Sequence, residues 1–397
     1  MQLLDISLIN YRNIKNANVR FSDGINILFG ENANGKTNII EAVYQFAQGK
    51  SFRTKNNLDL ISFDKNYCDI TINFSAGSNS IAALQTESAR NHRMNIKFDR
   101  DKTKKYMHNG VPYQKVSEFI GYFKSVLFTP DHLSLIKSLP ENRRKFLDIA
   151  ISQLKPVYVS YVVDYMRILN QRNHLLKKIK LNGGGVSQSI ESELEIWTEK
   201  LAKYSAMITR YRGEYTERLK EFAPSFYNGL SGGKDVISLN YVSQINKYNK
   251  DFEEFRNYEL CEKLYGEIYE RGIREEINYG TTLYGPHRDD LYVAVDGKSS
   301  RNIASQGQQR SAVLALKLAE GEISKMANGE YPVFLLDDIL SELDRSRQEF
   351  IFKNLENRQV IVTCCNKELF EGMNVSNVIE VTNGEFEVTQ NVYTSGG

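Results

Sequence analysis

The segment GENANGKT (residues 30–37) has the residue types and spacing of a loop that holds phosphate groups. Gly30, Gly35, Lys36 and Thr37 fit the pattern G-x-x-x-x-G-K-[ST]. The residues between the two glycines are Glu31, Asn32, Ala33 and Asn34. Glycines let the backbone curl so that N–H groups surround a phosphate, the lysine adds charge, and the hydroxyl suits Mg²⁺. A strand-like run before the loop and helical spacing after it disfavour an incidental glycine-rich turn.

A second group of chemistry-bearing residues follows the apolar run Val333–Leu336. Four consecutive apolar residues predict a strand that is covered on both faces. Asp337 then lies at the carboxyl end of the strand, where open α/β sheets bind ligands. We expect Asp337 to hold Mg²⁺ and Asp338 to orient or deprotonate an attacking water.

A third candidate is SQGQQR (residues 305–310), which opens a predicted helix about thirty residues before the acidic strand. Ser305, the N–H groups around Gly307 and the amide of Gln308 can donate hydrogen bonds to an anion at the helix start, aided by the field at the helix end. An ordinary helix cap is the alternative. GLSGGKD (residues 229–235) has a similar composition, but a strand pattern follows it, so we interpret it as a turn.

The elements that must position these residues follow from apolar periodicity. Two strand-like segments and the strand GINILFG precede the phosphate loop, and a helix follows it. Short strands are expected at about 58–128. Two helices, at 157–181 and 190–222, flank NGGGVSQS and predict an antiparallel hairpin. The predicted C-terminal order is helix 306–327, strand 333–337, helix 344–356, strand 359–364, and a hairpin at Asn383-Gly384.

Composition sets broad limits on the class of protein. The 397 residues allow two or three domains, and 41% hydrophobic with 25% charged residues is ordinary for a globular chain. No apolar run is long enough for a membrane span, and the N-terminus does not resemble a signal peptide. The four cysteines form no C-x-x-C pair, so the cytoplasm is the expected compartment. A net charge of +2 does not decide for or against nucleic acid.

The long gap between the phosphate loop and the acidic strand requires a large insertion. Together with the two strands before the loop, this order resembles ATP-binding-cassette ATPases of the chromosome-maintenance type. The resemblance implies an α/β fold: a cassette-type P-loop ATPase head with an inserted, mainly helical second domain that contains a short antiparallel helical hairpin. The expected boundaries are 1–128 for the N-terminal part of the head, 129–277 for the insertion, and 278–397 for the C-terminal part.

Longer blocks make the resemblance more specific. They are INYRN (9–13), GENANGKTN (30–38), FTPDHLSLIKSLPENRRKFLD (128–148), YGPHRDDL (284–291), SQGQQRSAVLALKLAEGE (305–322) and VFLLDDILSELDRSR (333–347). They resemble the RecF family of bacterial recombination and replication-repair ATPases. The resemblance implies an ATP-driven homodimer that binds duplex or gapped DNA without sequence specificity. It implies that in this dimer Ser305, Gly307 and Gln308 of one chain contact the γ-phosphate of the nucleotide bound by the partner chain. It also implies work with RecR and RecO, help in loading the RecA recombinase, ATP and Mg²⁺ as cofactors, and a nucleoid-associated location in the cytoplasm.

Some positions depart from the cassette pattern or leave alternatives open. Asp338 stands where cassette transporters carry glutamate, and the shorter carboxylate suggests slow hydrolysis that serves as a switch. The resemblance implies that DNA stimulates this weak hydrolysis; whether the chain turns over ATP is left open. Cys364, Cys365 and Asn366 occupy the place of a γ-phosphate-sensing histidine. Arg12 is expected at the nucleotide, the alternative being a solvated strand-end arginine.

The residues that contact DNA are not determined by the sequence. The basic candidates are Arg53 and Lys55; Lys102, Lys104 and Lys105; and Arg143, Arg144 and Lys145. Each run is also compatible with a solvated face, and their value would lie in phosphate contacts. Two other functions stay open: an ATPase subunit of a membrane transporter, which the large insertion disfavours, and an SMC-like structural head, which the short hairpin disfavours.

Overall fold

The computed structural model describes residues 1–77, 91–101, 103–183, 187–245, 256–301, 304–366, 370 and 373–391. The chain forms two compact units. The first contains residues 1–134, 225–234 and 310–397, and the second contains 135–224 and 235–309. The domain boundaries expected from the sequence, at 128 and 277, stay a prediction.

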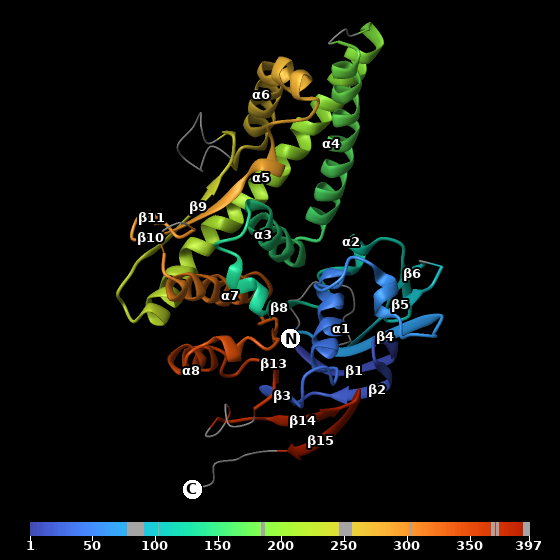
Figure 1. The fold of residues 1–397 in the computed structure, drawn as a ribbon, viewed down its shortest axis with the longest axis vertical. Helices are drawn as coiled ribbons and strands as arrows, with labels where there is room; N and C mark the ends of the chain where they lie inside the picture. Colours follow the sequence, from blue (N-terminus) through green and yellow to red (C-terminus); the bar gives the residue numbers. More distant parts are fainter. Residues whose placement is uncertain are drawn as a thin grey trace. The chain divides into compact units, whose positions relative to one another are not determined.

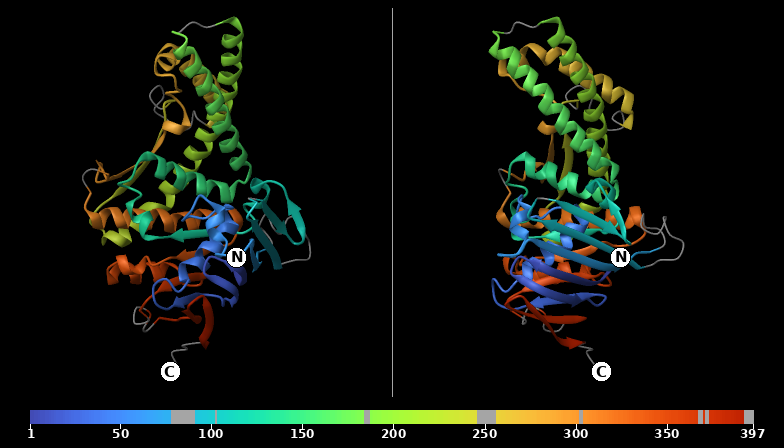
Figure 2. Two further views of the ribbon diagram at one scale, coloured as in Figure 1. Left: turned by 45° about the vertical axis from the view of Figure 1, so that its right-hand side comes forward. Right: turned by 90° about the vertical axis from the view of Figure 1, so that its right-hand side faces the viewer.

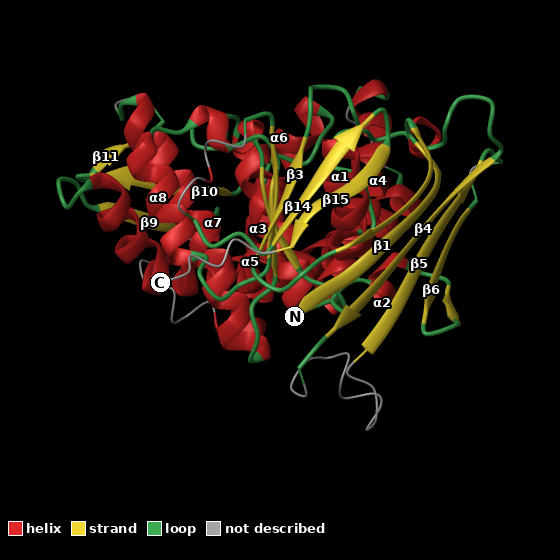
Figure 3. Ribbon diagram, turned by 90° about the horizontal axis from the view of Figure 1, so that it is seen from below, coloured by secondary structure: helices red, strands yellow, loops and turns green. Residues whose placement is uncertain are grey.

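The first unit contains an antiparallel sheet whose alternating side chains bury one face. Its strands, in spatial order, are β2 (Ile14–Arg20), β1 (Gln2–Tyr11), β4 (Tyr67–Ser75), β5 (Asn91–Asp99), β6 (Lys104–His108) and β7 (Val111–Tyr113). Figure 3 shows β1, β4, β5 and β6 side by side. Ile6 lies opposite Ile72, and Ile70 lies opposite Ile96, all fully buried. The periodicity of two therefore directs one apolar face into the core.

A second, mostly parallel sheet in the same unit carries the strands that end at the predicted site. Its order is β15 (Glu385–Asn391), β14 (Asn377–Thr382), β3 (Ile25–Phe29), β13 (Val360–Cys364), β12 (Val333–Leu336) and β8 (Ser125–Phe128). Only β15, at the edge, runs antiparallel to its neighbour. Every residue of β8, β12 and β13 is buried. The continuous apolar run Val333–Leu336 predicted this coverage on both faces for β12.

Helix α1 (Lys36–Gln48) starts directly after the phosphate loop and is almost wholly buried. Its side chains, including Ile40 and Phe46, share one hydrophobic core with Ile72 of the antiparallel sheet and with Leu335 and Ile361 of the parallel sheet. Figure 1 shows α1 in blue beside the strands of both sheets. The core therefore fixes the N-terminus of α1 against the carboxyl ends of the parallel strands.

The remaining helices of the C-terminal half agree closely with the sequence prediction. Helix α7 covers Gln306–Asn328 and α8 covers Arg345–Asn354. A short helix, α2 (Val116–Phe119), follows β7. The apolar stripe of α7, which includes Val313, Leu314 and Leu318, is buried.

The second unit is mainly helical, with one small antiparallel sheet. Its helices are α3 (Pro140–Leu154), α4 (Val157–Leu181), α5 (Gln188–Ser231), whose last turns belong to the first unit, and α6 (Tyr258–Tyr279). Its sheet has the order β11 (Lys298–Ser299), β10 (Asp290–Val295) and β9 (Ile237–Val242). The views of Figures 1 and 2 agree that α4 and α5 run side by side as the predicted hairpin. Arg172 of α4 and Glu276 of α6 form a fully buried ion pair at 2.7 Å.

The segment GLSGGKD (residues 229–235) contains the C-terminal end of helix α5. The helix extends nine residues beyond the predicted end at 222 and contains Pro224, so the proline does not terminate it. Gly232 and Gly233 both have positive φ, and the Gly233 N–H donates to the Asn228 carbonyl at 2.9 Å. A Cβ on Gly229 would lie 2.1 Å from the Phe350 ring. The glycines therefore serve close packing and a helix C-cap. The interpretation as a turn is right for Gly232 and Gly233, whereas residues 229–231 are the last residues of α5.

Candidate nucleotide-binding site

The phosphate loop joins β3 to α1 in a conformation that depends on its glycines. Gly30 has φ 154°, and a Cβ there would lie 2.2 Å from the Val381 carbonyl oxygen. Gly35 has φ 110° and is the N-cap of α1, with no side-chain cap and no acidic residue in the first turn. The first N–H groups of this 13-residue helix thus have no competing carboxylate, as an anion site requires.

Lys36 lies across the loop with its ammonium group on the loop's own carbonyl oxygens. Its Nζ donates to the Gly30 oxygen at 2.5 Å and to the Glu31 oxygen at 2.8 Å. The same Nζ lies 3.4 Å from the sulfur of Cys365, which follows β13. The charge is therefore held inside the loop, where a phosphate oxygen can replace the neutral carbonyls as its partner.

Thr37 and Asp337 meet although they are far apart in the chain. The Thr37 hydroxyl donates to Oδ1 of Asp337 at 2.8 Å, and the Thr363 hydroxyl donates to the same oxygen at 3.0 Å. Burial raises the pKa of the Asp337 carboxyl, while these two hydrogen bonds lower it. A hydroxyl and a carboxylate are the oxygen donors that Mg²⁺ prefers, so the pair fits that ion.

No cluster of three or more histidine, cysteine, aspartate or glutamate side chains arranged to hold a metal occurs in the part of the chain that the structure describes. A site of one hydroxyl and one carboxylate is what a magnesium ion needs when phosphate oxygens and water complete its shell.

Asp338 has a left-handed backbone, with φ 50°. Its N–H donates to the Thr363 hydroxyl oxygen at 2.9 Å, so Thr363 anchors both consecutive aspartates. Asp338 lines the same cavity as Lys36 and Thr37. The structure therefore brings together the phosphate loop and the acidic strand end that the sequence predicted.

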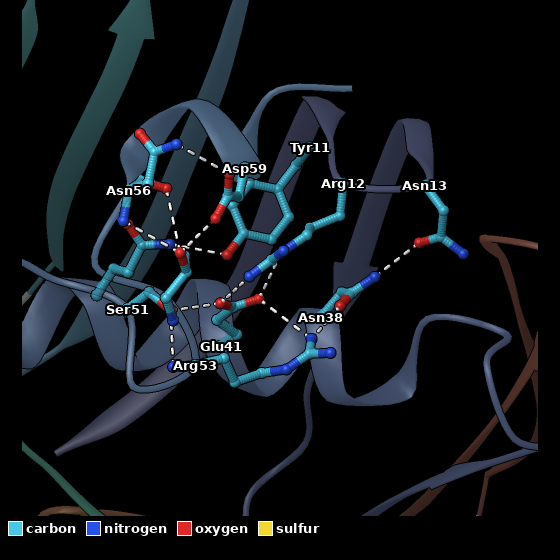
Figure 4. A network of polar contacts seen from close by, with 11 residues as sticks. Tyr11, Arg12, Asn13, Asn38, Glu41, Ser51, Arg53, Asn56 and Asp59 are labelled. Atoms are coloured by element: carbon cyan, nitrogen blue, oxygen red, sulfur yellow. Dashed lines mark hydrogen bonds and ion pairs between the residues drawn. The ribbon is translucent and has the colours of Figure 1, made fainter. Parts of the chain in front are cut away.

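The cavity over the loop has a volume of about 750 Å³, which suits a nucleotide-sized ligand. Arg12, Arg53 and Arg100 line it together with the loop. Figure 4 shows Arg12 and Arg53 directed at Glu41. Arg12 makes two hydrogen bonds to the Glu41 carboxylate, at 2.5 and 2.9 Å, and Arg53 lies 3.4 Å from it. Glu41 is fully buried and thus holds two cations at the cavity wall.

Sequence reasoning missed Glu41, Thr363 and the place of Arg53. The sequence places Glu41 one helical turn after the phosphate loop. Its role depends on two arginines from other segments, and the sequence does not show that they contact it. Arg53 was a DNA candidate, yet its Nη1 donates to Asn38 at 2.7 Å inside the cavity wall. Arg12 lies at the cavity, where the sequence placed it.

The other basic candidates differ in exposure. Lys104 donates to the Gly49 carbonyl oxygen, and burial lowers its pKa to about 8. Arg143 is buried and pairs with Asp290 at 2.7 Å, and Arg144 donates to the Asp289 carbonyl oxygen. These three cations support the fold. Lys55, Lys105 and Lys145 are exposed, and Lys102 lies outside the described residues.

Ser305 and Gln308 form a reciprocal cap at the start of α7. The Gln308 N–H donates to the Ser305 hydroxyl oxygen at 3.2 Å, and the Ser305 N–H donates to Oε1 of Gln308 at 2.8 Å. This is the helix cap that the sequence left open as an alternative. Both residues and Gly307 belong to the second unit, whereas all residues that line the cavity belong to the first.

Comparison with known proteins identifies the family. The sequence model of the RecF/RecN/SMC N terminal domain matches residues 2–390. A DNA replication and repair protein RecF from Bacillus mycoides is 38% identical over 387 residues, which are 97% of this chain and 98% of that protein. The chain belongs to the RecF family. A RecF protein from Ruminiclostridium cellulolyticum is 37% identical over 370 residues, 93% of this chain and 94% of its own.

Solved structures confirm the fold class. The recombination mediator protein RecF of the RecFOR pathway, with ATPrS, has a TM-score of 0.86 at 32% identity, and 98% of each chain is covered. A structure of the recombination mediator protein RecF with ATP has a TM-score of 0.85 at 31% identity, and 98% of each chain is covered. An SMC head bound to the C-winged helix domain of ScpA has a TM-score of 0.57 at 16% identity, a likeness of fold alone. The RecF family therefore shares the predicted head with SMC proteins.

Proposed function

We propose that this RecF family member is an ATP-dependent DNA-binding protein of recombinational repair and replication restart. The contact between the Thr37 hydroxyl and Asp337, with the Lys36 ammonium held in the loop beside it, carries the proposal. Two RecF structures whose titles name ATP or ATPrS support ATP as the ligand. The relatives named DNA replication and repair protein RecF support a role in DNA replication and repair.

The residues of the loop bind and orient the triphosphate. Backbone N–H groups of residues 30–35 and the start of α1 surround phosphate oxygens, and Lys36 exchanges its carbonyl partners for them. Thr37 and Asp337 hold Mg²⁺, which when bound neutralises charge on the phosphates. Arg12 and Arg53, kept in place by Glu41, add positive charge along the cavity wall.

Asp338 is the residue that orients and deprotonates the attacking water. It lines the cavity, and the Thr363 hydroxyl fixes its backbone. Aspartate is one methylene shorter than glutamate, which suits slow hydrolysis that limits the lifetime of a bound state. Hydrolysis by this proposal is weak, is stimulated by DNA, and acts as a switch.

A homodimer completes each site. Ser305, Gly307 and Gln308 begin α7, a helix of 23 residues whose N-terminus suits an anion. The proposal assigns them to the γ-phosphate of the partner's ATP. The reciprocal cap between Ser305 and Gln308 presets the helix start for that contact.

DNA contacts involve phosphates, because none of the identified motifs reads base edges. The exposed lysines, Lys55, Lys105 and Lys145, are the remaining candidates. By family resemblance the partners are RecR and RecO, with RecA loaded at gaps. No helix of the described residues is long and apolar enough to cross a membrane. The proposed location is the cytoplasm, in association with the nucleoid.

The other functions considered from the sequence are not favoured. RecF relatives match 93–97% of this chain, including the inserted unit, whereas the SMC head resembles it in fold alone.

The test is light scattering of the purified protein without nucleotide, with ATP, and with ATP plus duplex or gapped DNA. The proposal expects a monomer without ATP, a dimer with ATP, and a larger complex when DNA is added. A protein that binds no ATP, or that binds DNA equally well without ATP, contradicts it.

A further inference from the structure

The phosphate loop lies against a β-hairpin from the other end of the chain. The side-chain Nδ2 of Asn34 donates to the Val381 oxygen at 3.1 Å, and the Gly384 N–H donates to the Asn34 oxygen at 2.9 Å. Strand β14 pairs with β3, the strand that leads into the loop, and β15 completes the hairpin (Figure 3). The side chain and the main chain of Asn34 therefore both join the loop to this hairpin.

Asn34 occupies a position that the phosphate-loop motif leaves free, between Gly30 and Gly35. Its neighbours Ala33 and Gly35 line the cavity, whereas Asn34 is not among the lining residues. Its amide nitrogen and its main-chain oxygen both bind the hairpin. Asn34 is therefore placed to hold the loop and not to touch a ligand.

The turn of the hairpin fits against the loop because its second residue is glycine. Asn383 and Gly384 have φ of 52° and 81°, as a two-residue hairpin turn with positive φ at both positions requires. A Cβ on Gly384 would lie 3.0 Å from the Asn13 carbonyl oxygen. The Asn13 side chain in turn donates to the Ala33 oxygen at 3.4 Å. The turn thus contacts the loop directly, through Asn34, and indirectly, through Asn13.

A phosphate loop binds its ligand only when successive N–H groups converge on the phosphate, and glycine-rich backbone loses much entropy when it is fixed in this way. We propose that the Asn383-Gly384 turn is a positioning element of the nucleotide site, with Asn34 as the positioning residue that connects it to the loop. The turn holds residues 30–34 in the ligand-binding conformation when no ligand is bound, so that the loop is ordered on folding and not on binding. This inference rests on the proposed binding of ATP at the same site.

A second hairpin supplies a matched control. Asn109-Gly110 connects β6 and β7 in the same unit, with φ of 49° and 80°, and a Cβ on Gly110 would meet nothing within 4 Å. Gly384→Ala and Gly110→Ala therefore add comparable backbone strain, but only the first adds an atom against Asn13. We expect the Kd of ATP to rise about tenfold in Gly384→Ala and to stay unchanged in Gly110→Ala. The Kd of inorganic tripolyphosphate, measured by competition, should follow that of ATP, because the contact acts on the phosphate loop.

Asn34→Ala removes the side-chain contact without adding atoms, so it tests the proposal even if Gly384→Ala fails to fold. When only about one loop in ten is preset in the free protein, ATP should associate about tenfold more slowly while its dissociation rate constant stays unchanged. Stopped-flow fluorescence with a fluorescent ATP analogue on the full-length protein measures both rate constants. A general loss of stability lowers the Tm but does not produce this split between the two rate constants.

A variant that combines Asn34→Ala with Gly384→Ala tests whether the two residues act through one contact. One shared contact predicts a Kd about tenfold above that of the wild type, whereas two independent effects multiply to about 100-fold.

The outcomes separate this inference from the proposed function. The positioning role is wrong if Asn34→Ala binds ATP as tightly as the wild type, or if Gly110→Ala loses as much affinity as Gly384→Ala. Faster dissociation in place of slower association, or multiplied effects in the combined variant, also overturns it. In each of these cases ATP binding by the wild type stands. A wild type that binds neither ATP nor tripolyphosphate overturns both proposals.

Discussion

The Thr37 hydroxyl lies 2.8 Å from the Asp337 carboxylate, although 300 positions separate the two residues. Thr37 lies in the first turn of α1, and Asp337 follows the buried strand β12. The parallel sheet places β13 between β3 and β12, and Thr363 of β13 donates to the same carboxylate oxygen at 3.0 Å. Three strand ends therefore build one Mg²⁺-compatible site.

Lys36→Ala is expected to abolish ATP binding. The ammonium group is held inside the loop by two carbonyl oxygens, and its loss removes charge-assisted hydrogen bonds to phosphate. We expect the Kd of ATP to rise at least about 100-fold, and ATP-driven dimerisation and DNA binding to be lost with it. Isothermal titration calorimetry measures the affinity. Lys55→Ala, which removes an exposed lysine outside the cavity, is the control, and near-normal ATP affinity of Lys36→Ala would contradict the assigned role.

Asp338→Asn is expected to bind Mg²⁺ and ATP normally while hydrolysis slows by a factor on the order of 100, because the base is lost and Asp337 remains. Single-turnover hydrolysis measures the rate, and the ATP-bound dimer should live longer. Asp338→Glu, which keeps the carboxylate, is the control and should retain measurable turnover. A wild-type rate in Asp338→Asn would show that another group is the base.

Cys365 is expected to report nucleotide binding through its reactivity. It is exposed, its thiol donates to Oδ1 of Asn32 at 3.0 Å, and its sulfur lies 3.4 Å from Lys36 Nζ. The other three cysteines are buried, and burial raises the pKa of Cys364 to about 12. Iodoacetamide should therefore modify Cys365 first, and saturating ATP should slow this reaction about tenfold or more.

Peptide mass spectrometry identifies the modified thiol. Cys365→Ser serves as the control for background alkylation, and Lys36→Ala should lose the protection by ATP. Equal rates with and without ATP would place Cys365 away from the bound nucleotide.

Asp289 in the second unit is expected to give the protein a pH-dependent stability. Burial raises the pKa of this carboxyl to about 7, and the Tyr241 hydroxyl donates to its Oδ2. The unfolded chain has an ordinary pKa of about 3.9, so between about pH 4 and 7 the folded state binds more protons. The free energy of unfolding, relative to Asp289→Asn, should therefore fall as pH rises through this window and level off above it.

Urea unfolding of both proteins at several pH values measures this difference. Tyr241→Phe, which removes a hydrogen bond that lowers the pKa, should keep the same sign of dependence. A relative stability that rises with pH would mean that Asp289 is ionised in the folded state at neutral pH.

Much of the site was predictable because its residues carry local signals. The glycines, lysine and threonine of the loop at 30–37 have the spacing of a known motif. The four apolar residues of β12 predict a buried strand that ends just before Asp337. Thr363 carries no such signal, because a threonine in an apolar strand is also ordinary core. Its role as the anchor of Asp337 and Asp338 follows only from the parallel pairing of β12 with β13.

In the fold, too, the features that depend on local sequence were predictable, and those that depend on tertiary contacts were not. Helix α4 was predicted with its observed bounds, because its apolar period is regular. Helix α5 continues past Pro224 to Ser231, although proline and the following glycines favour an earlier end. Arg143 looked like part of a basic surface run, yet it is buried against Asp290, a residue 147 positions away. A run of basic residues in the sequence therefore does not show which of its side chains are exposed.

Ser305→Arg is expected to separate ATP binding from dimerisation. Ser305 is not among the residues that line the cavity, and the resemblance to cassette-type ATPases assigns it to the partner's nucleotide. Arginine adds bulk at the helix start and removes the hydroxyl. We expect nearly unchanged ATP affinity of the monomer, with ATP-driven dimerisation and hydrolysis abolished, as measured by calorimetry and light scattering.

The Ser305→Arg substitution also removes the helix cap, because the Ser305 hydroxyl accepts a hydrogen bond from the Gln308 N–H. A control variant must separate this effect on stability from the effect on dimerisation. Loss of this hydrogen bond costs about 1 kcal/mol of stability. Ser305→Asn keeps a capping side chain without the bulk of arginine, so it should melt like the wild type and retain at least part of the ATP-dependent dimerisation. If both variants lose dimerisation equally, the contact depends on the serine hydroxyl itself and not on space at the helix start.

Mixing Ser305→Arg with Lys36→Ala gives the decisive comparison. A mixed dimer would pair the intact loop of one chain with the intact helix start of the other, so one site of two is restored and partial hydrolysis returns. Its second site carries both substitutions and stays inactive, which limits recovery to about half of the wild-type rate if the sites act independently.

Dimerisation of Ser305→Arg with ATP would make the segment an ordinary helix start. Loss of ATP binding by its monomer would place Ser305 in its own chain's pocket, because a residue that serves only the partner's nucleotide cannot affect the affinity of a monomer.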